Sequence, residues 1–453
     1  MMSENWPEGT HYVEAANLPK AFFDNVEQGG DRKLLFEKRD GDWHGRSWRE
    51  ISDDVRRLAA VLVECGVEPG ERVLISAENR PEWAIADLAI MAVGAIVVPA
   101  YTTNTEDDHH YIMDHSGASV AITSGGMLAS RIALAANRAP SLRHLIVMDD
   151  GFVAPQDLRP ELRYWGAAIE GADPLVDIDD RLAAQQPDDV CCFIYTSGTG
   201  GRPKGVMLTH RSIQANITAA VELLAEGKVV ENQRFLSLLP LSHSYEHTAG
   251  MHLPFQILGE VWYCESTDQI ANNLIEVSPT LMTAVPRLYE VLHDRIMRGV
   301  RAKGGLSEKL FMAAVRLGTK RLSGRHLLPH EFLLNLIVDR LVRTRSNTCI
   351  MYIGTVSISR LMKKLKQATT PKTLRQARMA PRASRSLAPA ALARAAACID
   401  SGPPRATAVP AWPVSVFSSV WLSDAFSGAL SAALVSFCLF IGDSCQSRYR
   451  SVE

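Results

Sequence analysis

The sequence predicts a protein of the α/β class, doubly wound over about its first 340 residues and followed by a tail of a different kind. Short apolar runs typical of buried parallel strands alternate with segments of helical period, which is the order that a doubly wound sheet requires. A glycine-rich loop follows one of these runs. Hydrophobic residues at 47% and charged residues at 22% are ordinary for a globular chain, and 453 residues can bury more than one core.

The apolar runs and the helical periods together predict the individual strands and helices. Asn79-Arg80-Pro81 is expected to cap a helix that runs to about Val93, since proline suits the first helical turn. An irregular stretch up to Pro187 predicts a boundary between two subdomains. Strands are expected at 72–77, 95–99, 119–123, 144–148, 190–195, 234–239, 260–264 and 280–285, and helices at 81–93, 209–226, 267–277 and 286–300.

The loop after the run 190–195 has the composition of a phosphate-binding site. Residues 195–210 read YTSGTGGRPKGVMLTH, and they lie between a buried parallel strand and a helix that starts near Thr209. Glycines let backbone N–H groups converge on an anion, while hydroxyls and one lysine add donors and positive charge. The candidate phosphate ligands are Thr196, Ser197, Gly198, Thr199, Gly200, Gly201 and Lys204. The loop is not a Walker A sequence, because Gly205 follows Lys204 where Ser or Thr is required.

The sequence of this loop resembles the signature of the adenylate-forming superfamily, Tyr-Thr-Ser-Gly-Thr-Thr-Gly-x-Pro-Lys-Gly-Val. This superfamily contains acyl-CoA synthetases, luciferases and peptide-synthetase adenylation domains. The chain departs once, with Gly200 in place of the second threonine. A glycine-rich strand-to-helix turn without function is the plain alternative. The missing hydroxyl is expected to weaken the hold on phosphate.

A second segment narrows the resemblance to long-chain acyl-CoA synthetases. Residues 239–247, LPLSHSYEH, resemble their Leu-Pro-Leu-x-His-x-x-Glu segment. The sequences of residues 47–124 and 279–292 also resemble those synthetases. The match covers about residues 5–343. The resemblance implies that His243 and Glu246 lie on the substrate side. The alternative for His243 is a histidine at a helix start that Ser242 caps.

The resemblance implies an adenylate-forming N-terminal domain of two stacked α/β subdomains, residues 1–188 and 189–343, with the ATP loop in the second. Its substrates would be a fatty acid, ATP with Mg²⁺, and coenzyme A. A fatty carboxylate would attack the α-phosphorus of ATP, and the coenzyme A thiol would then displace AMP. Lys204 and Thr196 would be catalytic through their contacts with the phosphates.

Two histidine clusters suggest metal sites as alternatives. Residues 243–247 fit H-x-x-E-H, the pattern of some zinc proteases, in which the glutamate is the base. Three fixed residues recur easily by chance, and a third ligand is not identified, so zinc hydrolysis is a remote alternative. The acidic and histidine-rich run 107–115 is interpreted instead as a solvated helix start capped by Thr105.

Beyond Arg343 the α/β pattern stops. Residues 340–399 hold thirteen Lys or Arg and no Asp or Glu. The family's Tyr-Gly-x-Thr-Glu and Thr-Gly-Asp elements and its lid lysine are not found in 344–453, so impaired catalysis is expected, and a non-catalytic nucleotide-binding remnant is the alternative function. The favoured interpretation of this tail is an out-of-frame translation or a truncated gene product with little order. A basic arm before a membrane span at 425–442 and a partner-binding domain are the other two.

Charge and cysteines bear on location and partners. Outside residues 340–399 the chain carries 35 basic and 50 acidic side chains, which argues against nucleic-acid binding. Eight cysteines show no framework or metal spacing, and no signal peptide precedes Trp6, so a cytoplasmic protein is expected. Peripheral membrane contact stays open, and no protein partner is predicted.

Overall fold

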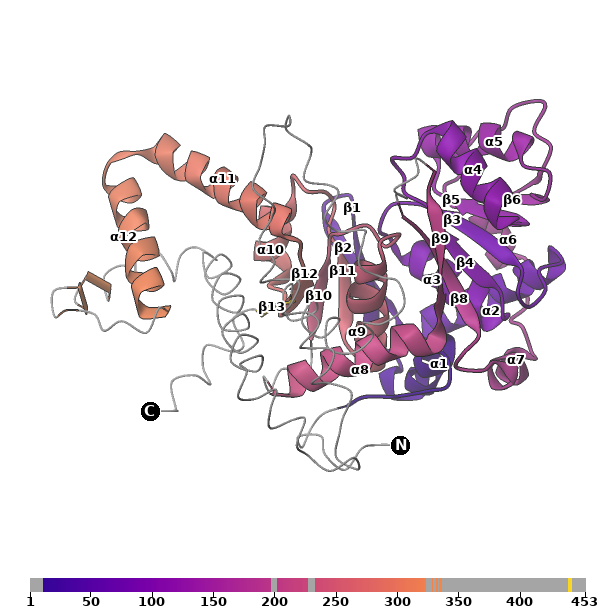
Figure 1. Cartoon of the computed structure of the whole chain (residues 1–453), viewed down its shortest axis with the longest axis horizontal. Coiled ribbons are helices and arrows are strands. Elements are labelled where there is room, and N and C mark those ends of the chain that lie inside the picture. Colours follow the sequence, from indigo (N-terminus) through magenta and orange to yellow (C-terminus); the bar gives the residue numbers. More distant parts are fainter. Residues whose placement is uncertain are drawn as a thin grey trace, which may run out of the picture. The chain divides into compact units, whose positions relative to one another are not determined.

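The computed structural model describes residues 11–196, 202–226, 233–322, 328, 331–332, 334–335 and 439–441. The chain divides into two compact units, the first running to Ile270 and the second starting at Ala271. The first contains two sheets with helices on their faces (Figure 1).

A seven-stranded sheet forms the larger layer of the first unit. Its strands are parallel except the last, which runs antiparallel to its neighbour. In spatial order they are β7 (Glu161–Tyr164), β6 (His144–Val147), β5 (Val120–Thr123), β3 (Arg72–Ser76), β4 (Ile96–Pro99), β8 (Val190–Thr196) and β9 (Lys204–Thr209). The central strands are buried on both faces, as parallel strands between helices must be.

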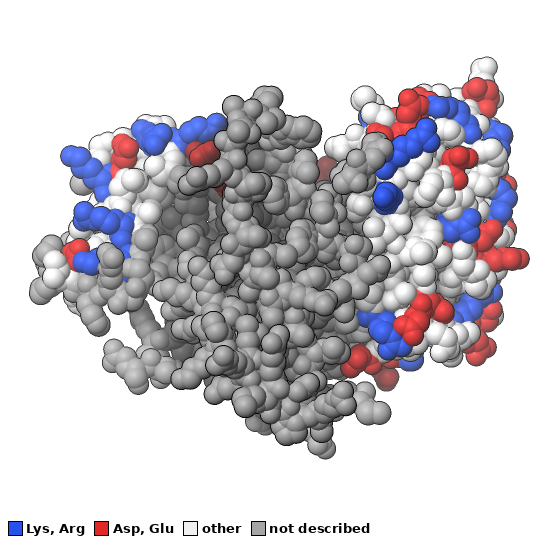
Figure 2. Space-filling view, viewed as in Figure 1, with Lys and Arg blue, Asp and Glu red and all other residues white. Residues whose placement is uncertain are grey.

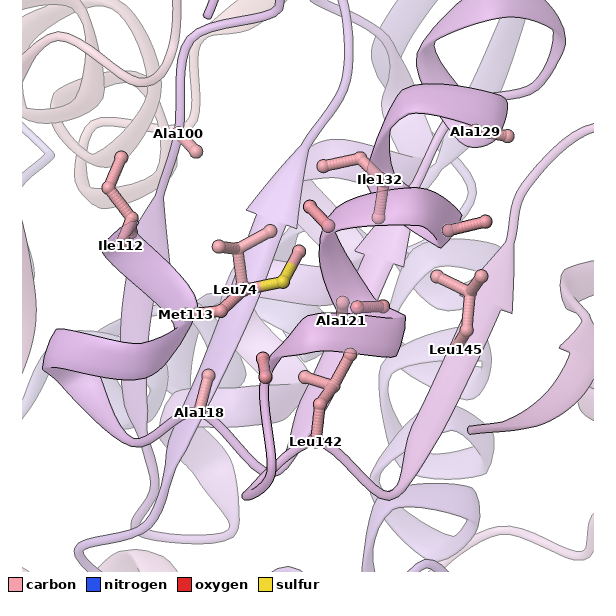
Figure 3. Close-up of a cluster of buried hydrophobic side chains, with 14 of the residues drawn as sticks. Leu74, Ala100, Ile112, Met113, Ala118, Ala121, Ala129, Ile132, Leu142 and Leu145 are labelled. Atoms are coloured by element: carbon pink, nitrogen blue, oxygen red, sulfur yellow. The ribbon is translucent and has the colours of Figure 1, made fainter. Parts of the chain in front are cut away.

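Apolar side chains join this sheet to the helices on one of its faces. Leu74 of β3, Ala121 of β5 and Leu145 of β6 point toward Ile112 and Ile132, which come from two neighbouring helices (Figure 3). The helices of the first unit are α1 (Leu18–Gly29), α2 (Trp48–Glu64), α3 (Pro81–Ala92), α4 (Glu106–Ser116), α5 (Gly126–Arg138), α6 (Trp165–Glu170), α7 (Ile178–Ala184), α8 (His210–Glu226), the π-helix η1 (Glu246–His252) and α9 (Leu253–Gln256). Alternate residues of each strand thus face opposite helix layers.

The second sheet of this unit pairs distant parts of the chain. Strand β1 (Lys33–Arg39) runs parallel to β11 (Glu260–Tyr263), which in turn pairs with β10 (Arg234–Ser237). Strand β2 (Asp42–Ser47) closes a hairpin on β1. Asp40 and Gly41, with φ of 52° and 90°, form its two-residue turn, where both backbones must be left-handed.

The second unit contains fewer described elements. They are β12 (Leu281–Thr283), α11 (Pro286–Lys303), α12 (Gly305–Leu322) and β13 (Leu439–Ile441), while α10 (Ile270–Val277) starts at the division between the units. Strand β13 pairs antiparallel with β12. Within the tail 344–453, the structure describes only the three residues of β13. The three interpretations of the tail, including the candidate membrane span at 425–442, concern residues that lie almost entirely outside the described ones. None of the described helices is long and apolar enough to cross a membrane.

The predicted strands and helices are confirmed to within a few residues, but several elements were not predicted. These are the helices α1, α2, α5, α6, α7, α9 and α12, the π-helix η1 and the strands β1, β2, β7, β9 and β13. The expected boundary between residues 188 and 189 does not separate the sheets, because β8 and β9 complete the first sheet while β1 and β2 belong to the second.

Candidate functional site

The candidate phosphate loop connects two antiparallel neighbours, β8 and β9. Thr196 ends β8 and Lys204 begins β9, and the two residues face each other in the antiparallel register. Ser197, Gly198, Thr199, Gly200 and Gly201 lie outside the described residues. The expectation of a strand followed directly by a helix is therefore corrected, since six residues of strand come before α8. Lys204 is exposed at the base of the turn, and Thr196 is half-buried.

Helix α4 contacts the chain on both sides of this turn. Before the turn, the hydroxyl of Tyr195 lies 2.9 Å from Nδ1 of His115. After it, the hydroxyl of Tyr111 donates to the carbonyl oxygen of Pro203 across 2.9 Å. The guanidinium of Arg202 lies over the Tyr111 ring, 5.6 Å from its centroid. One helix thus fixes the two ends between which the glycine-rich residues run.

Burial of Tyr195 keeps its hydroxyl protonated, so that it can take part in these contacts. Burial, and secondarily the neighbouring Tyr111, raise the pKa of Tyr195 to about 12, so its hydroxyl keeps its proton at neutral pH. A neutral phenol is available as a hydrogen-bonding partner of His115. The sequence analysis named neither tyrosine as a site residue. Tyr195 directly precedes the candidate phosphate ligand Thr196, and Tyr111 lies in α4.

The acidic and histidine-rich run is a helix start, as predicted. Thr105 is the N-cap of α4, and its side chain and that of Asp108 form a reciprocal capping box. The term solvated was wrong for His109, which is fully buried. Burial, and then the charge of Arg131, lower the pKa of His109 to about 4.

The segment 239–247 leads from β10 into η1. Burial lowers the pKa of His243, and its Nδ1 accepts from the backbone N–H of Tyr245 at 3.2 Å. The Glu246 carboxylate is fully buried, and its Oε1 accepts from the Ser237 hydroxyl at 2.7 Å. Glu246 thus joins η1 to β10, and its contact with substrate stays a prediction, as does that of His243.

Asn79 holds this segment against the first sheet and was missed as a functional residue. Its amide nitrogen donates to the carbonyl oxygen of Leu239 at 2.7 Å and to the Ser237 hydroxyl at 3.0 Å. Its amide oxygen accepts from the N–H of Leu241 at 3.0 Å. The predicted helix start at Asn79-Arg80-Pro81 is confirmed, with Arg80 as the N-cap of α3 and Pro81 in its first turn. An amide with both ends engaged fixes the course of residues 239–241.

The H-x-x-E-H residues do not converge as a zinc hydrolase requires. Among the described residues, one group of possible metal ligands lies close together, and it contains His247 with Asp87 and His252. His243 is not in that group, and Glu246 is bonded to Ser237 instead.

Charge on the visible surface is mixed. Lys and Arg are interspersed with Asp and Glu on the part that carries α4 and α5 (Figure 2). Such a surface lacks the one-sided basic field that favours nucleic-acid binding.

Comparison with known proteins supports the resemblance that the loop carries. The chain matches the family described as AMP-binding enzyme over residues 22–376. It is 28% identical over 347 residues to the long-chain-fatty-acid–CoA ligase ACSBG2 of Xenopus laevis, covering 73% of this chain and 46% of that protein. It is 30% identical over 285 residues to the long-chain-fatty-acid–CoA ligase FadD15 of Mycobacterium tuberculosis, covering 62% and 45%. The chain spans about half the length of the curated relatives it matches.

Solved structures agree on the fold. The A domain of a carboxylic acid reductase from Segniliparus rugosus, in complex with AMP and a co-purified carboxylic acid, superposes with a TM-score of 0.54 at 19% identity, covering 65% of this chain and 52% of that one. The anthranilate CoA ligase AuaEII, in complex with anthranoyl-AMP, gives 0.50 at 22% identity, covering 64% and 51%. The predicted α/β class, of the kind found in the N-terminal domains of adenylate-forming enzymes, is confirmed. By its sequence, the chain belongs to the AMP-binding enzyme family.

Proposed function

We propose that this chain carries the nucleotide-binding part of a long-chain fatty acid–CoA ligase. The observation that carries the proposal is the antiparallel pairing of β8 with β9, which places Thr196 and Lys204 opposite each other at the two ends of the Ser-, Thr- and Gly-rich segment 197–203. The names of the curated relatives support the substrate class. The candidate phosphate ligands remain those expected from the sequence, Thr196 to Thr199, Gly200, Gly201 and Lys204.

The proposed reaction has two displacements. An oxygen of the fatty carboxylate bonds to the α-phosphorus of Mg·ATP while the bond from that phosphorus to the bridging oxygen breaks, releasing pyrophosphate. The coenzyme A sulfur then attacks the acyl carbonyl carbon, AMP leaves, and the thiol gives up its proton. Mg²⁺ arrives with the substrate ATP. Lys204 neutralises charge on the phosphates, and donors of the turn stabilise the pentacoordinate phosphorus.

His243 and Glu246 are proposed to shape the acyl side. The buried hydrogen bond of Glu246 to Ser237 and the hold of Asn79 on Leu239 give the segment 239–247 a fixed course. A fixed segment can form one wall for an acyl chain without reorganising on binding.

Catalysis by this 453-residue chain is proposed to be weak. The Tyr-Gly-x-Thr-Glu and Thr-Gly-Asp elements and the lid lysine of the family are not found in residues 344–453. Each lost charge-stabilising group costs orders of magnitude in rate, so formation of palmitoyl-CoA from palmitate, ATP and coenzyme A is expected near background. Restoring a reading frame that encodes these elements after Arg343 is expected to restore activity. Robust palmitoyl-CoA formation by the unchanged chain, abolished by Lys204→Ala, would contradict the proposed impairment.

Thermal unfolding with and without Mg·ATP tests the nucleotide site. Mg·ATP at a hundred times its dissociation constant stabilises the native state by about 2.7 kcal/mol, and Lys204→Ala is expected to abolish that shift. Lys20→Ala is the matched control, because it removes an exposed lysine that pairs with Asp24 on α1, and it should keep the shift. An equal shift in Lys204→Ala and wild type would remove the loop from the proposal, and absence of any wild-type shift would favour a remnant that no longer binds nucleotide.

A further inference from the structure

Three polar side chains meet inside the first unit, where none of them reaches solvent. Asp87 and His247 are fully buried, and His252 is 1% exposed. Nε2 of His247 lies 2.8 Å from Oδ1 of Asp87, and Nε2 of His252 lies 3.2 Å from Oδ2 of the same carboxylate. One ligand atom from each residue lies within 4.8 Å of the other two. Neither the phosphate loop nor the proposed reaction uses this cluster.

A rare helix geometry brings the two histidines together. His247 and His252 are five residues apart, and in an α-helix they would point about 140° away from each other. Residues Glu246–His252 form a π-helix, confirmed by the bond from the N–H of Leu253 to the carbonyl oxygen of Thr248. Because the π-helix bonds residues i and i+5, side chains five apart lie one above the other. The rings of His247 and His252 are 4.7 Å apart as a result.

Hydrogen bonds within the cluster do not satisfy its polar atoms. Oδ2 of Asp87, Nδ1 of His247 and Nε2 of His252 have no hydrogen-bond partner among the described residues. The 3.2 Å contact of His252 with Asp87 is short enough, but the ring N–H direction is not that of a hydrogen bond. Each buried atom left without a partner costs about 1–3 kcal/mol. An ion bound by Oδ2 of Asp87 and Nε2 of His252 would remove that cost for these two atoms.

The donor types suit a cation. Metal ions bind ionised carboxylates and neutral imidazoles, and the cluster offers one carboxylate and two imidazoles. Aromatic rings enclose the cluster, with Trp83 against His247 and Phe255 against His252. Neither ring carries a positive charge.

We propose that Asp87, His247 and His252 bind one Zn²⁺ ion as a structural site. Two imidazoles and a carboxylate are a common donor set for Zn²⁺, and the two oxygens of Asp87 provide a third and fourth donor atom. Two ligands about 2.1 Å from a tetrahedral ion lie roughly 3.4 Å apart, near the 3.2 Å contact of His252 with Asp87. The 2.8 Å hydrogen bond between His247 and Asp87 would lengthen to admit the ion. Because all three residues are buried, the site has no open position for substrate and differs from a hydrolase centre. The ion would hold η1 against α3, which carries Asp87.

Metal content of the purified 453-residue chain tests the site. The chain is produced with Zn²⁺ in the medium, dialysed against metal-free buffer and analysed by mass spectrometry for zinc. Wild type should retain about one equivalent. Asp87→Asn and His252→Asn should lose it, because each keeps a polar side chain of similar size but removes a ligand. His109→Asn is the matched control, since His109 is equally buried, has two unpartnered ring nitrogens and lies outside the cluster.

A second test uses the wild-type chain alone, so its result does not depend on whether a variant folds. Chain produced with Co²⁺ in place of Zn²⁺ should show the visible absorption of tetrahedral Co²⁺, and a chelator should lower the melting temperature of the zinc-loaded wild type. Wild type that holds no zinc, shows no Co²⁺ absorption and is indifferent to chelator would overturn the proposal, and would identify the cluster as a metal-free network in which a protonated histidine neutralises Asp87. Retention of zinc by His252→Asn, or its loss from His109→Asn, would also overturn it.

Discussion

Tyr111 donates its hydroxyl to the carbonyl oxygen of Pro203, so one hydrogen bond joins α4 to the chain that leaves the candidate phosphate loop. His115, one turn further along α4, meets Tyr195 on the other side of the loop. Residues three and four apart share one face of a helix, which is why a single helix reaches both ends of the turn.

Tyr111→Phe should loosen the turn while leaving the ring in place. We expect the free energy of unfolding to fall by about 1 kcal/mol, and the stabilisation by Mg·ATP to shrink as well, because the donors are then less well positioned. Thermal unfolding with and without Mg·ATP measures both. Tyr164→Phe is the control, since it removes a similar bond to the carbonyl oxygen of Phe152, away from the loop. If both variants keep the full nucleotide shift, α4 does not position the loop.

Gly250→Ala should destabilise the first unit. A Cβ at Gly250 would overlap the Glu246 carboxylate, which cannot easily move because it is buried and bonded to Ser237. We expect a loss of about 1–3 kcal/mol in the free energy of unfolding, measured by urea denaturation. Gly299→Ala is the matched control in helix α11, where a Cβ meets nothing within 4 Å, and it should be neutral or stabilising. Equal effects of the two substitutions would contradict the packing described for η1.

Leu74→Ala should create a cavity between the seven-stranded sheet and helices α4 and α5. Leu74 is fully buried at the centre of the cluster in Figure 3. The expected cost is about 2–5 kcal/mol, because the surrounding structure fills such a cavity only in part. Met127→Ala on α5 should change stability by less than about 0.5 kcal/mol, since Met127 is 81% exposed. A Leu74→Ala loss as small as that of Met127→Ala would mean that this core is not packed as described.

His109 should make stability depend on pH. Its pKa is lowered from 6.5 to about 4 by burial and then by the charge of Arg131, while Asp108 opposes the shift. The unfolded chain therefore binds more protons between these values, so stability is full above pH 6.5 and is lost as the pH falls toward 4. Between pH 7.5 and 5 this loss is about 2 kcal/mol.

His109→Leu should remove that part of the pH dependence, measured as the free energy of unfolding in urea at both pH values. Ile112→Val on the same helix is the control, because it should destabilise equally at both. An unchanged pH dependence in His109→Leu would show that this histidine is not held neutral.

The sequence predicts best the elements whose signal is local. The run 190–195 is apolar enough to identify β8 without knowledge of its partners. Strand β9 has no such run, since its six residues begin with Lys204 and Gly205 and none of them is fully buried. The division of strands between the two sheets was also not predictable, because β1 finds its parallel partner in β11, far along the chain.

The same holds for the site residues. Glycine, hydroxyl and lysine composition marked the loop, but Tyr111 and Asn79 act through bonds to residues 92 and about 160 positions away. Asp87 left one local signal, a carboxylate in the middle of a helix whose other residues are almost all apolar. The π-helix that places His247 and His252 near it has no sequence signature of its own.

The parallel pairing of Leu35 with Val261 has a consequence for synthesis of the protein. At about 5–20 residues per second, a ribosome needs roughly 11–45 s after delivering Leu35 to deliver Val261. During that time the β1–β2 hairpin has no β11 to cover its edge, and an uncovered strand edge can pair with another chain. Slower translation between residues 47 and 260 should therefore increase aggregation of the nascent chain, and chaperones that bind extended apolar segments should have their longest contact with β1.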